Sequence, residues 1–266
     1  MMETEKLLEI LAGVKNCAVT AGRYFKQAAI EKIAEKSGNS DLVTNVDRQT
    51  QQLIQTQLQQ LPLQAAFVSE EQENTDLTDE YTWIVDPIDG TSNYIFGREM
   101  SFVSIALAYK KQTVLACCYN PYRDELFWAV KGRGAYMNEQ HLWIKPRPLA
   151  QSLLAVGTAP YDKDVSDATF SCLKDLFNAG LDIRRSGSCV ADLCYLAKNE
   201  HHAFYEAKVS LWDYAAGALI VEEAGGEVNI NADTLHLGKT YIMAGNSDNF
   251  VNLKAICYRY IEANNA

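Results

Sequence analysis

The residues best able to do chemistry lie in one stretch of the chain, 83–93. Its apolar start, 83–85, predicts a buried strand, and the Asp-Pro and Asp-Gly pairs that follow predict an abrupt turn. Proline has a fixed φ and glycine tolerates a positive φ, so this loop should be stiff where the carboxylates of Asp86 and Asp89 converge. Two carboxylates in a stiff loop suit a hard divalent cation. The alternative is an ordinary turn between strands.

Two further acidic residues could meet this pair. Asp213 lies in the first turn of a predicted helix, where a carboxylate faces the positive end of the helix dipole. Its alternative role is that of a plain helix-start acid. Glu70 follows a short predicted strand, 66–69, and would arrive at the same end of the sheet if that strand neighbours the one that leads to Asp86.

Asp47 and Glu206 are two more candidate site residues, and each could instead have a purely structural role. Asp47 fits a capping box, in which Thr44 caps a helix and the carboxylate three residues later returns to the cap amide. A capping acid already stands at the mouth of a helix, so a capping role and a role in a site can coexist. Glu206 lies near the end of a predicted strand and could equally be a solvated charge on the rim of a site.

The composition limits the classes of function. The chain of 266 residues has a formal net charge of −10 and no basic run, which argues against binding to a nucleic-acid backbone. No apolar run approaches the ~18 residues of a membrane helix, and the first residues show no secretory signal. We therefore expect a cytoplasmic protein that does not bind membranes. The seven cysteines and four histidines lack the spacing of a zinc site and predict reduced, buried thiols.

The first half of the chain should form two helices and a sheet. Apolar residues at steps of three and four, from Leu7 to Phe25, predict a long amphipathic helix within 3–35, which 38–40 would break, and a second helix is predicted up to Pro62. Strands are predicted at 66–69 and 83–85, followed by an antiparallel meander of 101–109, 113–119 and 125–130.

The second half alternates strand and helix patterns, which predicts an α/β layer. The punctuation at 145–148 marks a boundary between two lobes. Strands are predicted at 153–156, 181–184, 203–206, 227–230 and 241–244. Helices are predicted at 164–179, 189–198, 213–224 and from residue 247 onward.

Four motifs stand out along the chain: Asp41-Leu42-Val43-Thr44 with Asp47, Glu70-Glu71, Asp86-Pro87-Ile88-Asp89-Gly90-Thr91, and Trp212-Asp213 with Ala215-Ala216-Gly217. Together they resemble the inositol monophosphatase family of metal-dependent, lithium-sensitive sugar phosphatases, and the resemblance covers nearly the whole chain. The resemblance implies an α+β protein with the layered αβαβα sugar phosphatase fold. It implies one catalytic domain, 1–266, with lobes 1–147 and 148–266, and a homodimer.

The resemblance also implies a ligand set for two or three Mg²⁺ ions, with Mn²⁺ as a possible substitute. Glu70, Asp86 and the carbonyl of Ile88 resemble the ligands of the first ion, and Asp86, Asp89 and Asp213 resemble those of the second. The implied catalytic residues are Asp47, Thr91 and Glu70, of which Thr91 and Asp47 orient the attacking water. Two such metals would lower the pKa of that water and neutralise the phosphate, so hydrolysis would need no covalent intermediate.

The substrate would be a small phosphorylated sugar or polyol. The residues that resemble its contacts are Asp89, Gly90, Thr91, Cys189, Glu206 and Asp213, with the amides of Gly90 and Thr91 on the phosphate. The chain departs from the commoner family pattern at Gln72, in the short turn 185–187, and at Cys189, where a small residue is usual. A thiol at a helix start beside an anion site could also have a lowered pKa and be oxidisable; its alternative is a buried filler.

The leading expected activity is Mg²⁺-dependent hydrolysis of inositol monophosphate. The alternatives are a relative acting on fructose 1,6-bisphosphate, 3′-phosphoadenosine 5′-phosphate, NADP or histidinol phosphate, and a non-catalytic metal- and phosphate-binding protein. Asn93-Tyr94 favours the inositol-like branch over the nucleotide branch. Aspartyl-phosphate enzymes of the haloacid dehalogenase type end a strand with similar residues, but their nucleophile lies two residues before the second Asp. That position is Pro87 here, so their covalent mechanism has no nucleophile in register.

Overall fold

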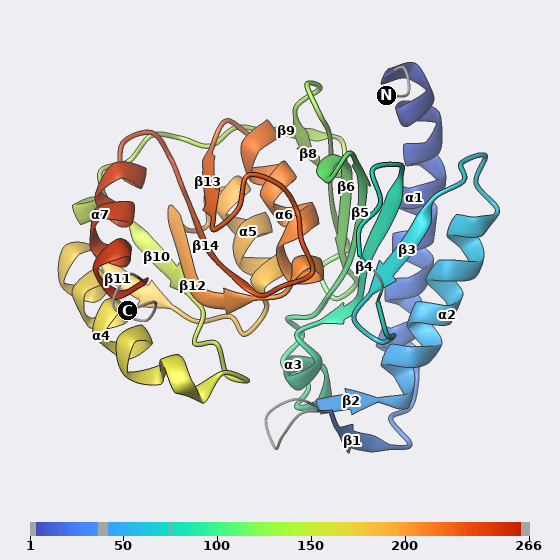
Figure 1. Ribbon diagram of the computed structural model, residues 1–266, viewed down its shortest axis with the longest axis horizontal. Coiled ribbons are helices and arrows are strands. Elements are labelled where there is room, and N and C mark those ends of the chain that lie inside the picture. Colours follow the sequence, from blue (N-terminus) through green and yellow to red (C-terminus); the bar gives the residue numbers. More distant parts are fainter. Residues whose placement is uncertain (1–3, 37–41, 75, 262–266) are drawn as a thin grey trace.

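The computed structural model describes residues 4–36, 42–74 and 76–261, whose helices and strands stack in five layers (Figure 1). From one side of the molecule to the other, the layers are α1 (Thr4–Gln27) with α2 (Asn45–Gln59), the first sheet, α5 (Cys189–Ala197) with α6 (Leu211–Glu223), the second sheet, and α4 (Ser166–Ala179) with α7 (Phe250–Ile261). This order confirms the predicted αβαβα fold. The division into lobes 1–147 and 148–266 remains a prediction.

The first sheet has seven strands in chain order. They are β3 (Ala66–Ser69), β4 (Thr82–Asp89), β5 (Phe102–Tyr109), β6 (Gln112–Asn120), β7 (Glu125–Val130), β8 (Ala135–Met137) and β9 (Gln140–Leu142). β3 and β4 are parallel neighbours, and every later pair is antiparallel, as the predicted meander requires. β8 and β9 were not predicted, because a strand of three residues is too short to show the alternation of apolar and polar residues.

The second sheet has the strand order β11-β10-β12-β14-β13. Its strands are β10 (Leu153–Val156), β11 (Asp182–Arg184), β12 (Ala203–Val209), β13 (Glu227–Ile230) and β14 (Thr240–Gly245). β10 is parallel to both of its neighbours, whereas β14 is antiparallel to β12 and β13. Two 3₁₀ turns, η1 (Leu149–Gln151) and η2 (Lys163–Val165), flank β10 and α4.

Successive residues of the central strands face different cores, which explains why these strands read as unbroken apolar runs. Trp83, Val85 and Ile105 pack toward α1 and α2. Ile84 and Ala106 pack toward α5 and α6. A sheet with both faces buried needs apolar residues at every position, so the period of two disappears from the sequence.

The first helix is shorter than predicted, because α1 ends at Gln27. Residues Ile33–Glu35 form a strand, β1, which pairs antiparallel with β2 (Leu42–Thr44). The side chain of Asn45 accepts hydrogen bonds from the amides of Glu31 and Lys32, at 2.9 and 3.1 Å, and so holds this segment outside the helix. The predicted break at 38–40, and Asp41 of the first family motif, lie outside the described residues.

The far end of α6 is fastened to the first sheet by one carboxylate. The amides of Gly132, Arg133 and Gly134, between β7 and β8, donate to Glu223 at 2.7, 3.0 and 2.8 Å. Both glycines have a positive φ, which lets successive amides point at one acceptor. Because Asp213 stands in the first turn of α6, this contact helps to fix the helix that carries it.

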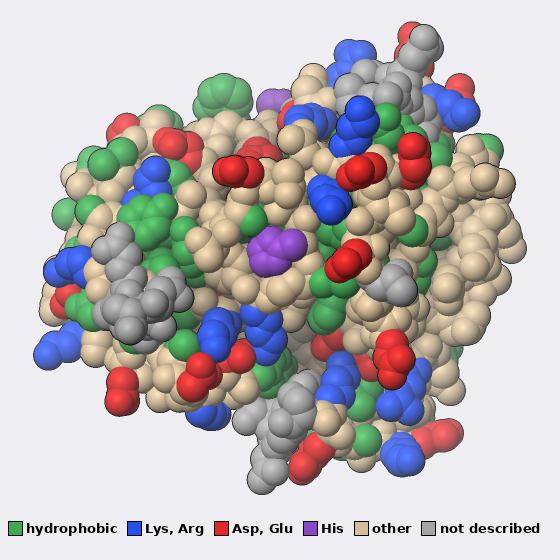
Figure 2. Space-filling view, in the orientation of Figure 1, with side chains coloured by type: hydrophobic (Ala, Val, Ile, Leu, Met, Phe, Trp, Pro, Cys, Tyr) green, Lys and Arg blue, Asp and Glu red, His purple; other side chains and the backbone are tan. Residues whose placement is uncertain are grey.

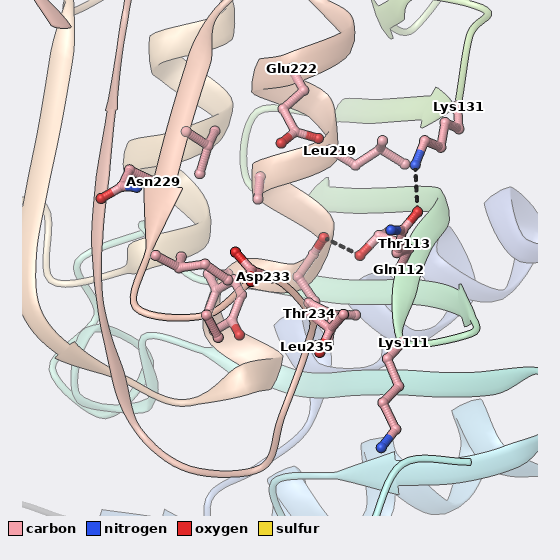
Figure 3. A pocket seen from close by; sticks show the side chains of 16 residues that line it. Lys111, Gln112, Thr113, Lys131, Leu219, Glu222, Asn229, Asp233, Thr234 and Leu235 are labelled. Carbon is pink, nitrogen blue, oxygen red and sulfur yellow. Dashed lines mark hydrogen bonds between the residues drawn. The ribbon is translucent and has the colours of Figure 1, made fainter. Parts of the chain in front are cut away.

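A groove lined in part by residues of α6 and β6 lies where α6 packs on the first sheet (Figure 3). Thr113 Oγ1 donates to the carbonyl of Ala215 at 3.2 Å, and Lys131 Nζ donates to Gln112 Oε1 at 3.0 Å. The amide of Leu235 donates to the carbonyl of Lys111 at 3.0 Å. The Thr113 and Leu235 contacts tie α6 and the loop before β14 to the first sheet, whereas the bond from Lys131 to Gln112 joins two segments of that sheet. Among the described residues, no helix combines the length and apolar character that crossing a membrane requires.

Candidate active site

The predicted strand 83–85 is too short, because β4 continues through Asp89 and the chain turns at Gly90. Asp86 pairs with Ser104 and Asp89 pairs with Phe102, so three steps along β4 match two steps along β5. The extra residue is a β-bulge. In a regular strand, residues three apart point to opposite faces, but Ser104 and Phe102 share a face. The bulge therefore brings both carboxylates to the same side.

The third acid of the site comes from the second half of the chain. Asp213 is the third residue of α6 and forms a capping box with Ser210, whose amide donates to Asp213 Oδ2 at 2.7 Å. The helix-start role and the site role therefore coincide. Carboxylate oxygens of Asp86, Asp89 and Asp213 all lie within 4.8 Å of one another. Two elements from different layers, β4 and α6, thus converge on one point.

Each aspartate of this cluster has an elevated pKa. Burial, together with the charges of Glu70, Asp89 and Asp213, raises the pKa of Asp86 well above its usual range. Burial likewise raises the pKa of Asp213, with Asp89 as the nearest charged contributor. Burial raises the pKa of Asp89 to about 7, against the opposing hydrogen bonds from Ser188 and Val190. The three buried carboxylates repel one another because too little positive charge lies near them. This set of oxygen donors therefore fits a divalent cation.

Asp89 also joins the first sheet to α5. Its Oδ2 atom accepts hydrogen bonds from the Ser188 hydroxyl, which caps α5, and from the amide of Val190 at 3.1 Å. Asp86 is held locally, because its Oδ1 atom accepts the amide of Ile88 at 2.9 Å. Both side chains are oriented by donors on one oxygen, which leaves the other oxygen of each for a ligand.

Glu70 lies in the same cleft, but its carboxylate pairs with Lys36 at 2.8 Å and is outside the cluster of three aspartates. Lys36 also pairs with Glu71, whose side chain is almost fully buried. Burial and the neighbouring Glu70 raise the pKa of Glu71 to about 7, against the attraction of Lys36. Nothing in the sequence indicated Lys36, because Lys36 reaches the two glutamates only through the fold of the chain after β1.

Asp47 and Thr91 form a hydrogen-bonded pair next to the cluster. Thr91 opens the short helix α3 (Thr91–Ile95), and its Oγ1 atom lies 3.1 Å from Asp47 Oδ1 and 3.1 Å from the carbonyl of Ile88. The other oxygen of Asp47 accepts the amide of Thr44 at 2.8 Å, which completes the predicted capping box. Burial raises the pKa of Asp47, although the bonds from Thr44 oppose this shift.

Gly90 has a backbone that other residues would adopt only with strain. Its φ is +81°, and a Cβ atom there would lie 3.0 Å from the carbonyl oxygen of Met100. The residue therefore has to be glycine for the chain to turn between β4 and α3. The first amides of α3 have no acceptor within their own helix, so they remain available to an anion.

Glu206 and Cys189 line the same cleft as the three aspartates. Glu206 Oε1 accepts the amide of Ala159 at 3.0 Å, and burial raises the pKa of Glu206 to about 7. A Cβ atom on Gly157 would lie 1.9 Å from Glu206 Cδ, so glycine there leaves space for the carboxylate. Cys189 is buried, and burial with the nearby acids raises the pKa of its thiol. The hypothesis of a lowered thiol pKa at Cys189 is therefore wrong.

Several other residues that line the cleft were not assigned to a site from the sequence. They come from the segment after β10, the turn before α5, α5 itself, the end of β12 and the position before β14, and the polar ones are Tyr161, Asp162, Arg185, Asp192, Lys208, Ser210 and Lys239. No motif marks them, since each element only brings one or two of them to the cleft. Only the turn 187–189 before α5 had a sequence signal, through its position at a helix start.

The raised pKa values predict how stability changes with pH. Because the pKa of Asp89 and that of Glu206 are about 7 in the fold, against 3.8 and 4.5 ordinarily, the folded chain binds more protons than the unfolded chain between these limits. Without metal, stability should therefore fall as pH rises from about 4 to about 7, by roughly 6 kcal/mol for the two groups together. Urea unfolding with chelator and with Mg²⁺ measures this effect. Mg²⁺ should reduce the fall; parallel curves would contradict the prediction.

Comparison with known proteins places the chain in a family. The model of the inositol monophosphatase family matches residues 5–260. Inositol monophosphatase 2 of Solanum lycopersicum is 42% identical over 206 residues, which are 74% of this chain and 77% of that protein. Nus factor SuhB of Haemophilus influenzae is 35% identical over 241 residues, 90% of this chain and 88% of that protein.

Solved structures agree on the fold. The extragenic suppressor protein suhB from Bartonella henselae superposes with a TM-score of 0.84 at 28% identity, covering 94% of this chain and 98% of that one. An inositol monophosphatase from Anabaena superposes with a TM-score of 0.82 at 27% identity, covering 95% and 96%. With a matching family model over nearly its whole length and relatives above 30% identity, the chain belongs to the inositol monophosphatase family.

Proposed function

We propose that the protein is a Mg²⁺-dependent phosphomonoesterase, and that its substrate is inositol monophosphate or a similar small polyol phosphate. The observation that carries this proposal is the cluster of three aspartates within 4.8 Å of one another, at the end of the cleft that Glu206 and Cys189 also line. The hydrogen-bonded pair of Asp47 and Thr91 supports it. A charged cluster of this kind costs folding free energy, which a bound cation would offset.

Asp86, Asp89 and Asp213 would hold Mg²⁺, with the carbonyl of Ile88 and, once it leaves Lys36, the carboxylate of Glu70. Bound there, Mg²⁺ would neutralise the phosphate charge and make a water molecule more acidic. The family's two or three ions would share these ligands. Mn²⁺ has similar oxygen preferences and would serve as a substitute.

The chain's own residues would position the reactants. Thr91 Oγ1 donates its hydrogen to Asp47 Oδ1 and so presents a lone pair to the attacking water. Asp47, raised in pKa by burial, is suited to take up the proton that the water loses. The amides of Gly90 and Thr91 would bind the phosphate at the start of α3. Glu206 and Asp213 would accept hydrogen bonds from substrate hydroxyls.

Two other functions are less well supported. A relative acting on fructose 1,6-bisphosphate, 3′-phosphoadenosine 5′-phosphate, NADP or histidinol phosphate would use the same acids, so only assays separate these substrates. A non-catalytic binding protein should have lost a site residue, yet Asp47, Thr91 and the three aspartates are all present. Several relatives are named Nus factor SuhB, so a role in a larger assembly is the form that this second alternative would take.

We also propose a cytoplasmic homodimer that binds neither membranes nor nucleic acid. The net charge of −10 supports the last point. Exposed apolar side chains on and after α4, Phe170, Phe177 and Leu181, supply a surface that a second copy could cover. Sedimentation of the purified protein tests the dimer.

The deciding experiment is phosphate release from a panel of esters with Mg²⁺, with chelator and with added lithium. The panel contains inositol monophosphate, fructose 1,6-bisphosphate, 3′-phosphoadenosine 5′-phosphate, histidinol phosphate and NADP. We expect chelator-sensitive, lithium-inhibited release that is fastest from inositol monophosphate. If no ester is hydrolysed although Mg²⁺ binds in calorimetry, the binding-protein alternative replaces this proposal.

A further inference from the structure

The cleft has acidic residues at its base and basic residues along part of its rim. The base holds the three aspartates and Glu70, which the proposed cations would neutralise. The rim carries Arg185, Lys208 and Lys239, from three separate segments of the second half of the chain. Figure 2 shows side chains of both signs beside the hollow between the two sheets. Once cations occupy the base, the rim is a second, separate source of positive charge.

Lys208 and Lys239 lie on either side of one carboxylate. Lys239 Nζ is 2.6 Å from Asp162 Oδ2, and Lys208 Nζ is 3.7 Å from Asp162 Oδ1. One negative charge thus lies between two positive charges. Lys208 also pairs with Asp164 at 2.8 Å, but that side chain is 68% exposed, so solvent screens the pair. Asp162 therefore occupies the position between the two lysines that an anionic group of a substrate would take in its place.

Lys208 lies on the same strand as Glu206, which would accept hydrogen bonds from substrate hydroxyls. Glu206 and Lys208 are two residues apart on β12, and both line the cleft. A polyol whose hydroxyls reach Glu206 would present its far end to Lys208 and to Lys239. Arg185 adds to the positive charge, and its guanidinium opposes the rise that burial causes in the pKa of Glu206 and of Asp192.

We propose that Lys208 and Lys239 form a subsite for a second anionic group, a phosphate or a carboxylate, at the end of the substrate away from the cleaved ester. Beside inositol monophosphate, the enzyme would then also accept polyol phosphates that carry this additional charge, and it would bind them with a lower KM than their singly charged counterparts. This inference rests on the proposed phosphomonoesterase function and narrows it, because the rim would set KM for doubly charged substrates without taking part in the chemical step.

Two matched pairs of substrates test the subsite. Fructose 1-phosphate and fructose 1,6-bisphosphate differ by one phosphate, and glucitol 6-phosphate and 6-phosphogluconate, which are both open chains, differ by one carboxylate. Wild-type KM should be lower for the doubly charged member of at least one pair, and the pair that shows this identifies the anion. Lys239→Met and Lys208→Met should each raise that KM about tenfold, with kcat and the KM of the singly charged member unchanged within about twofold.

Three further variants separate the subsite from a structural effect. Lys239→Arg keeps the charge and should keep the preference, and Lys174→Met removes an exposed lysine elsewhere and should change nothing. Asp162→Asn removes the competing carboxylate and should lower KM for the doubly charged substrate. Equal KM changes for both members of a pair, or none, would overturn the inference.

Calorimetric binding of the same esters in the presence of Mg²⁺ keeps the test independent of turnover. If no ester is hydrolysed but the doubly charged one binds more tightly through the two lysines, the phosphatase proposal fails and the subsite stands. If esters are hydrolysed without any charge preference, the subsite fails and the phosphatase proposal stands.

Discussion

Replacing Asp213 by asparagine should lower kcat for phosphate release by about a thousandfold or more. The substitution keeps the size and the hydrogen-bond acceptor of the side chain, so the capping box with Ser210 can persist. It removes one of three negative charges within 4.8 Å of one another, and with it a ligand charge for Mg²⁺. Mg²⁺ titration by calorimetry should show weaker binding in parallel with the loss of rate.

The same substitution, which lowers kcat, should raise the stability of the metal-free protein. Without metal, Asp213→Asn should be more stable than the wild type near pH 7, because the repulsion that raises the pKa of Asp86 is reduced. Asp167→Asn is the matched control, since it neutralises an acid in the first turn of α4, away from the cleft. Near-normal turnover of Asp213→Asn would refute its place in the metal site.

Thr91→Val should lower kcat by about a hundredfold to a thousandfold while leaving Mg²⁺ affinity nearly unchanged. Valine has nearly the same shape as threonine but lacks the hydroxyl, so Asp47 Oδ1 loses its hydrogen-bond donor and the 3.1 Å contact with the carbonyl of Ile88 is lost as well. The cluster of aspartates itself stays intact. Single-turnover phosphate release and Mg²⁺ calorimetry on the same preparation measure the two quantities.

Thr91→Ser provides the control, because serine restores the hydroxyl and should return most of the rate. A Thr91→Val variant that retains wild-type turnover would mean that Thr91 only supports the fold of the turn after β4. A variant that loses Mg²⁺ binding as well as turnover would mean that the hydroxyl helps to shape the metal site rather than to place the water.

Much of the fold follows from local patterns. The bounds of β3, β7, β10 and β13 coincide with the predicted 66–69, 125–130, 153–156 and 227–230. Short strands between turn residues are easy to delimit, because the turn signals stand on both sides. The end of α1 was not predictable in this way, since Asn45, a residue of the next helix, holds the chain after it.

The candidate site follows from the sequence only in part. The acids stand in recognisable motifs, but what brings Asp86 and Asp89 to one side is a β-bulge, whose register depends on the partner strand β5. Lys36 and the basic rim carry no motif, and their positions depend on how hairpins and loops return to the cleft. Contacts between residues far apart in sequence cannot be read from residue types alone.

The contact between Glu223 and the turn 132–134 can form only late in translation. The turn that Glu223 holds is translated long before it, since Gly134 and Glu223 are 89 residues apart. At ~5–20 residues per second, a ribosome would need roughly 4 to 18 s to add those residues. Over the same period the face of the first sheet that carries Ile84 and Ala106 would lack its cover of α5 and α6. The nascent first half of the chain therefore presents an apolar surface that chaperones could recognise until the second half emerges.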